Sequence, residues 1–204
     1  MKSNRFVLSL IFVLLVLIGS TAFGQNNKKA SLFNTEGRSE AILFQKGYNL
    51  HQSGKYEEAL RQYNLALTIN VRYDVAWFAH GKTLIKLNHL EEAVKSISAA
   101  IECRNTVSAY WHELALVLHK LGQHERADKC FEVAIKYNPK TYQTWFNKGL
   151  AALKSGNYSQ AIEDLNIVVS NKPKFTYGWN NLAIAYSKTD QPDKALECYD
   201  SSLA

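Results

Sequence analysis

Hydrophobic and polar residues alternate along most of this chain in a pattern that repeats. From residue 40 to residue 204, apolar positions recur at helical spacing in two runs per block of 34 residues. An alanine lies near the start of the second run in every block, and a tryptophan lies near the start of the first run in the last four. The alanines are Ala59, Ala93, Ala127, Ala161 and Ala195, and the tryptophans are Trp77, Trp111, Trp145 and Trp179. The pattern predicts two helices per block.

The middle of each block carries a residue that favours a tight turn. These residues are Gly54, Asn88, Gly122, Gly156 and Asp190. Glycine and asparagine tolerate the left-handed backbone conformation that ends many helices. A small residue near the centre of the first run, such as Gly81 or Ala115, also predicts that a neighbouring helix packs closely there. Each block is therefore predicted to be a helical hairpin, near residues 40–73, 74–107, 108–141, 142–175 and 176–204.

This arrangement resembles the tetratricopeptide repeat. The period carries W-x2-L-[GA]-x2-[LY] in the first helix and A-x3-[FY]-x2-A in the second. The third block matches most fully, with Trp111, Leu114, Ala115, Leu118, Ala127, Phe131, Ala134 and Pro139. Lys46, His80 and Lys148 stand where the family usually has leucine. The resemblance implies an all-α, right-handed α-solenoid of five helix-turn-helix repeats, in which each hairpin buries its apolar face against the next.

Residues 1–24 have a different composition. Basic residues precede an apolar run from Phe6 to Ile18, and small residues at Ala22 and Gly24 follow. This order is typical of a secretory signal peptide. We expect cleavage near Gly24 and export to a periplasmic or secreted location, with residues 25–39 as a polar linker before the repeat domain at 40–204. The alternative is an uncleaved membrane anchor, which would be a marginal span.

Composition and charge narrow the classes of partner. The chain is 47% hydrophobic and 21% charged, as expected for a folded protein. Its net charge is +6, and without residues 1–24, which hold two of the 24 basic residues, it is 22 − 18 = +4. A mild excess of positive charge without clustered arginines does not predict nucleic-acid binding. Contact with a membrane is expected only if the N-terminal segment stays uncleaved.

The sequence offers no candidate for catalysis or for a metal site. No H-E-x-x-H, G-x-S-x-G or C-x-x-C motif is present. Cys103, Cys130 and Cys198 are best interpreted as small residues that pack between helices. His112 and His119 lie two helical turns apart, too far to share one ion without other ligands. We therefore expect no enzyme, no cofactor, no metal and no small-molecule substrate.

The resemblance also implies where a partner would bind. In tetratricopeptide proteins the first helices line a concave groove, and certain positions in each repeat point into it. On this chain those positions include ten residues that we take as candidates for partner binding: Phe78, Lys82, His112, Phe146, Asn147, Leu150, Tyr177, Asn180, Asn181 and Ile184. The full pattern of basic and asparagine residues in the family's carboxylate clamp is not matched from either the first or the third repeat. The expected partner is a protein or an extended peptide segment.

Two groups of groove residues allow two interpretations each. Asn147 and Asn181 occupy the same position of consecutive repeats, and their amides could hold a peptide backbone or could only solvate the groove. Four lysines recur near the ends of the first helices and could form a basic rim, although lysines there also favour the helix dipole. We favour the dipole interpretation for the lysines, which are Lys86, Lys120, Lys154 and Lys188.

The sequence as a whole predicts a non-enzymatic protein-interaction module of the exported or envelope compartment. A partner segment would bind in its concave groove. The alternative is a structural subunit of an envelope assembly, anchored to the membrane through its N-terminus.

Overall fold

The computed structural model describes residues 39–203, and within that range the regular structure is entirely helical. The predicted signal segment and all of the predicted linker except Ser39 lie outside the described residues. The first described helix spans residues 39–52. It is followed by α2 (Tyr56–Ile69), α3 (Asp74–Lys86), α4 (Leu90–Cys103), α5 (Ser108–Lys120), α6 (His124–Tyr137), α7 (Tyr142–Ser155), α8 (Tyr158–Asn171), α9 (Thr176–Lys188) and α10 (Pro192–Leu203).

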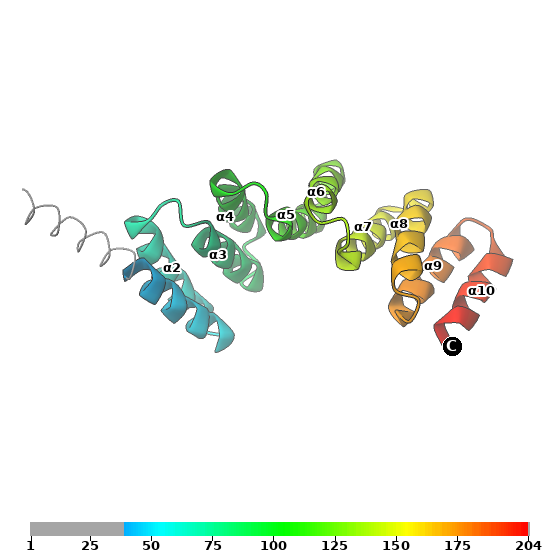
Figure 1. Ribbon diagram of the computed structural model, residues 1–204, viewed down its shortest axis with the longest axis horizontal. Coiled ribbons are helices and arrows are strands. Elements are labelled where there is room, and N and C mark those ends of the chain that lie inside the picture. Colours follow the sequence, from blue (N-terminus) through cyan, green and yellow to red (C-terminus); the bar gives the residue numbers. More distant parts are fainter. Residues whose placement is uncertain (1–38, 204) are drawn as a thin grey trace, which may run out of the picture.

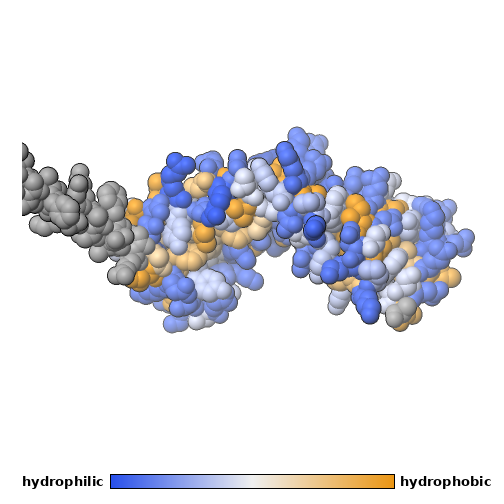
Figure 2. All heavy atoms as spheres, viewed as in Figure 1, coloured by the Kyte–Doolittle hydropathy of each residue, from blue (hydrophilic) through white to orange (hydrophobic). Residues whose placement is uncertain are grey.

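Consecutive helices form antiparallel hairpins that stack side by side. We call the first helix of each hairpin an A helix (39–52, α3, α5, α7 and α9) and the second a B helix (α2, α4, α6, α8 and α10). Each of α3, α5, α7 and α9 packs against the B helix that follows it and against the B helix of the preceding hairpin. The stack forms an arch with a hollow beneath it (Figures 1 and 2). The predicted all-α solenoid is therefore confirmed.

The turn inside each hairpin contains one residue with a left-handed backbone. Its φ is 75° at Gly54, 74° at Gly122 and 81° at Gly156, and it is 62° at Asn88 and 56° at Asp190. These are the five turn positions that the sequence predicts, so that prediction is confirmed. At Asn88 and Asp190 a short polar side chain tolerates this conformation at a modest energetic cost.

The two helices of a hairpin approach each other closely where the A helix has a small residue. A Cβ atom added to Gly81 would lie 2.7 Å from Ile97 Cγ1 on α4, and one added to Gly149 would lie 2.9 Å from Leu165 Cγ on α8. Ala115, the equivalent residue of α5, is completely buried. The predicted close approach at these positions is therefore confirmed.

Each tryptophan ties its A helix to the loop that precedes it. The Nε1 atom of Trp77 donates a hydrogen bond to the carbonyl of Val71 at 2.8 Å, and Trp111 bonds Asn105 in the same way at 2.7 Å. Trp145 and Trp179 repeat this contact with the carbonyls of Pro139 and Pro173. The acceptor is always six residues earlier, which explains why the indole recurs at this position.

The hydrophobic core divides at α7. One cluster of buried side chains runs from Leu84 on α3 to Ala151 on α7, and a second runs from Ala152 on α7 to Cys198 on α10. Two adjacent residues of one helix thus face different clusters. Hydrophilic residues cover much of the visible surface, with apolar residues showing between the helices (Figure 2).

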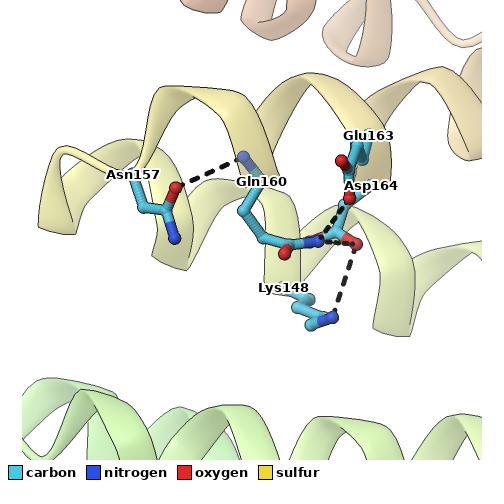
Figure 3. Close-up of polar contacts among 5 residues, drawn as sticks. All are labelled: Lys148, Asn157, Gln160, Glu163 and Asp164. Atoms are coloured by element: carbon cyan, nitrogen blue, oxygen red, sulfur yellow. Dashed lines mark hydrogen bonds and ion pairs between the residues drawn. The ribbon is translucent and has the colours of Figure 1, made fainter.

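A buried ion pair lies inside the fourth hairpin. Lys148 Nζ on α7 lies 3.5 Å from Asp164 Oδ1 on α8, and the side chains are only 11% and 1% exposed. Gln160 Nε2 donates to the same oxygen at 3.2 Å, whereas Asp164 Oδ2 has no hydrogen-bond partner among the described residues (Figure 3). Burial raises the pKa of Asp164 to about 6, although Lys148 and Gln160 oppose the rise.

In the second hairpin the same two positions hold a hydrogen-bonded pair, and in the third and fifth they hold leucine and cysteine. His80 Nδ1 lies 3.0 Å from Ser96 Oγ. Leu114 with Cys130 and Leu182 with Cys198 are buried. All three cysteines are free thiols, and Cys103 is half-buried. The interpretation of Cys130 and Cys198 as packing residues is confirmed.

None of the described helices combines the length and the apolar character needed to cross a lipid bilayer.

Candidate functional site

The A helices contact one another through residues that the sequence places in the groove. On α3, the ring of Phe78 packs against Tyr110 of α5, with centroids 4.6 Å apart. Lys82 Nζ lies 5.7 Å from the centre of the Phe78 ring, and the lysine is exposed. Tyr110 also donates a hydrogen bond to the buried Asp74, which fixes the start of α3 against α5. Phe78 is therefore partly a packing residue, and Lys82 is the more accessible of the two.

A small polar network joins α5 to α7 beside the division of the core. His112 Nδ1 lies 3.1 Å from Thr144 Oγ1, and Asn147 Nδ2 lies 3.2 Å from His112 Nε2. Because Asn147 can only donate through Nδ2, Nε2 accepts, and a neutral His112 then donates from Nδ1 to Thr144. Burial lowers the pKa of His112, which favours that neutral form.

These residues line a shallow cleft of about 390 Å³ between α5 and α7. Its walls include Ala109, Gln143 and Asn147, so a ligand there would meet both apolar surface and polar side chains. The structure thus brings His112 and Asn147 together, as the groove assignment requires. It also shows that one amide hydrogen of Asn147 is already engaged.

The other asparagines lie on α9. Asn181 Nδ2 donates to the carbonyl of Tyr177 at 2.7 Å, within its own helix. Asn180 is half-buried beside it. No hydrogen bond joins Asn147 to Asn181 among the described residues. The two amides therefore occupy equivalent positions of neighbouring A helices without direct contact, and within the described range each keeps a free carbonyl oxygen.

Aromatic side chains gather where α7 meets the loop between α8 and α9. The ring of Phe175, just before α9, lies 4.9 Å from Phe146, 5.4 Å from Tyr142 and 6.0 Å from Tyr177. We call these four residues the aromatic cluster. Phe146 and Tyr177 are predicted groove residues, and Tyr177 is 69% exposed. The cluster therefore connects two predicted groove residues with Tyr142 and Phe175.

The sequence did not point to the other half of this cluster. Tyr142 and Phe175 occupy the first position and the last position of repeats, outside the positions that the resemblance assigns to the groove. Phe175 directly follows Lys172-Pro173-Lys174. This mixture of apolar and basic residues in a loop could have indicated a binding surface. A cleft of about 540 Å³ lies here, lined by Tyr142 and by residues 171–175.

The remaining candidates lie on α7 and α9. Leu150 is half-buried and Ile184 is 43% exposed, so both can contribute apolar contact. A further cleft of about 480 Å³ on the first helix is lined by Ile42, Lys46 and Asn49 but by none of the predicted residues.

Metal-binding side chains do not gather anywhere in the described range. No group of three or more histidine, cysteine or acidic residues there could hold an ion. His119 lies against His124, with their Nδ1 atoms 3.0 Å apart, rather than toward His112.

Comparison with solved structures shows proteins of the same fold. A crystal structure of MamA superposes with a TM-score of 0.76 at 20% identity, covering 82% of this chain and 91% of that one. MamA from Desulfovibrio magneticus RS-1 gives 0.75 at 18% identity, covering 81% and 93%. YrrB, described as a TPR protein with an unusual peptide-binding site, gives 0.71 at 22% identity, covering 86% and 90%.

The family comparison agrees with these superpositions. No curated protein matches this chain. Family models described as the tetratricopeptide repeat match residues 40–70, 75–105, 112–175 and 177–204. Together these segments include all or most of every described helix, and the chain belongs to the tetratricopeptide repeat family.

Proposed function

We propose that this chain is a non-catalytic protein-interaction scaffold that holds an extended segment of a partner protein along its A helices. The observation that carries this proposal is the continuity of the groove face. Contacts between neighbouring A helices run from Phe78 through Tyr110 and from His112 to Asn147, and the aromatic cluster joins α7 to α9. A segment lying on this face would touch four consecutive hairpins.

The side chains on this face suit an extended backbone. Asn147, Asn180 and Asn181 offer amide donors and acceptors, which can pair with a peptide backbone whatever its side chains are. Tyr177 and Ile184 add exposed apolar surface beside them. Backbone hydrogen bonds would then supply affinity, and the apolar neighbours would supply a modest preference for certain side chains. The peptide-binding site named for YrrB supports this kind of partner.

The test is a double substitution on the groove face. Random dodecapeptides displayed on phage are panned against the chain, and enriched sequences are synthesised as fluorescent probes. In Asn147→Ala with Asn181→Ala we expect a loss of about 5–100-fold in affinity by fluorescence anisotropy. The reason is that each lost hydrogen bond contributes about 0.5–1.5 kcal/mol. Asn64→Ala, an exposed asparagine on α2, is the matched control and should bind normally.

Two results would contradict the proposal. One is panning that enriches no peptide above a mock surface. The other is full retention of the probes by the double variant, which would move the search to the convex face. Melting temperatures of both variants must stay close to that of the wild type, so that lost binding is not lost folding.

The proposed compartment is the exported or envelope space, and its support is the composition of residues 1–24 alone. In the main proposal the segment is cleaved near Gly24 and the scaffold is free. In the second candidate the segment persists and tethers a structural subunit to the membrane. N-terminal sequencing of the native protein distinguishes them, because Gln25 as first residue supports export and Met1 in the membrane fraction supports the anchor.

A further inference from the structure

The cleft at the start of α7 has apolar walls and a basic rim. Tyr142, Pro173 and Phe175 supply apolar surface, and Lys172 and Lys174 flank them in the loop between α8 and α9. Lys172 Nζ lies 5.5 Å from the centre of the Tyr142 ring. None of the residues that line the cleft is acidic. A volume of about 540 Å³ is enough to hold one large apolar side chain.

The part of the sequence that carries this cleft holds more basic than acidic residues. The stretch from residue 140 to residue 188 holds six lysines and only two acidic residues, Glu163 and Asp164. Asp164 is buried against Lys148, and Glu163 accepts a hydrogen bond from Gln160 on α8. Neither Lys172 nor Lys174 forms an ion pair with any described residue. Their charges are therefore available to a ligand.

The cleft is continuous with the proposed peptide groove. Phe175 lines the cleft and also contacts Phe146 and Tyr177, which belong to the groove face. A segment lying along α7 and α9 would thus reach the cleft without leaving the surface of the protein. A side chain that enters the cleft brings its sequence neighbours within reach of the two loop lysines.

We propose that the partner segment is acidic, and that it anchors here by placing a large apolar side chain in the cleft and adjacent carboxylates on Lys172 and Lys174. This inference rests on the proposed function and specifies the chemistry of the partner. The apolar side chain contributes binding energy because it leaves water when it enters the cleft. The carboxylates determine where along the groove the segment binds. Binding weakens as salt concentration rises, because the loop lysines are exposed.

The test uses the dodecapeptides enriched by panning against the full chain, synthesised with amidated C-termini so that only side-chain carboxylates are present. We expect the enriched sequences to combine an aromatic or large aliphatic residue with neighbouring Asp or Glu. Lys172→Glu with Lys174→Glu should weaken the probe by at least about tenfold, since each attraction becomes a repulsion. Changing the apolar residue of the probe to alanine should weaken its affinity for the chain by a similar factor.

The control is a charge reversal of the same size elsewhere. Lys95→Glu with Lys129→Glu changes two exposed lysines on the B helices α4 and α6 and should leave the affinity nearly unchanged. If the double variant is less stable than the wild type, Lys174→Glu alone replaces it in the binding test. Lys172, and not Lys174, contacts the Tyr142 ring, so this single variant keeps that contact. Enriched peptides without acidic residues, or equal binding by both reversals, would overturn the inference while leaving the groove proposal intact. Panning that enriches nothing would overturn both.

Discussion

At the scale of single residues, the most informative position is the one where the family usually has leucine. Lys148 departs from that leucine, and the structure shows that Asp164, sixteen residues later, accompanies the change. His80 departs in the same way and meets Ser96, also sixteen residues later. Where the leucine is kept, as at Leu114, the second position holds a cysteine. The sequence shows that Lys148 and His80 depart from leucine, but it does not by itself show that they contact Asp164 and Ser96. The constant spacing of sixteen residues becomes meaningful only once the hairpin is known.

The buried carboxylate should leave a signature in the pH dependence of stability. Because burial raises the pKa of Asp164 to about 6, the folded chain binds a proton more readily than the unfolded chain, whose carboxyl has an ordinary pKa. The contribution of this group to stability is therefore present below the unfolded pKa and is lost as pH rises through about 6. We expect denaturant unfolding of the wild type to show this loss between about pH 4 and pH 6.

A variant that carries the two residues of the third hairpin at these positions isolates the contribution of Asp164 to the pH dependence. Lys148→Leu with Asp164→Cys reproduces the pair Leu114 and Cys130 and should remove this part of the pH dependence. At pH 7.5 it should also raise the free energy of unfolding by about 1–4 kcal/mol, as replacing a buried ion pair often does. His80 and His112, whose pKa values burial lowers, titrate in both proteins and cancel in the comparison. An identical pH profile in the two proteins would show that Asp164 does not titrate in this range.

At the scale of helices, the sequence predicted most of the architecture because the repeat supplies four or five copies of each signal. The turn at Gly122 and the close approach at Gly81 each follow from backbone geometry that only a few residue types satisfy. The four recurring lysines do lie in the last turns of α3, α5, α7 and α9, as the helix-dipole interpretation requires.

Prediction was weaker where function depends on contacts between elements. The resemblance assigns groove positions one repeat at a time, so it cannot show that His112 reaches across to Asn147 or that Phe175 joins two A helices. Those contacts depend on how closely neighbouring hairpins stack, which varies with the side chains between them. The candidate site was therefore predicted as a set of positions and not as a surface.

At the scale of the whole molecule, the divided core suggests two units of stability. Ala151 belongs to the cluster of α3–α7, and Ala152 belongs to the cluster of α7–α10. Across the boundary between α5 and α7, hydrogen bonds join His112 to Thr144 and Asn147, and Ala151 is the one residue of α7 that packs into the first cluster among the described residues. In a stacked array stability is roughly a sum over repeats and their interfaces, so a weaker interface separates regions that can open independently.

Native-state hydrogen exchange can measure that separation with a matched pair of core substitutions. Leu118 on α5 and Leu182 on α9 are both 1% exposed. Leu182→Ala should lower the opening free energies of amides in α8–α10 by about 2–5 kcal/mol and leave those in α3–α5 nearly unchanged. Leu118→Ala should do the reverse. An equal loss along the whole array for either variant would mean that the chain unfolds as one cooperative unit.

The polar junction between α5 and α7 also bears on the entropy of binding. Hydrogen bonds between a few side chains resist bending less than interlocked apolar side chains do, so we expect thermal fluctuations of the arch to concentrate at this joint. A ligand confined to α7 and α9 leaves those fluctuations intact. A longer ligand that also reaches α3 suppresses them and loses part of its added contact energy to that ordering. Lengthening a bound peptide across the joint should therefore improve its affinity by less than the extra contact area suggests.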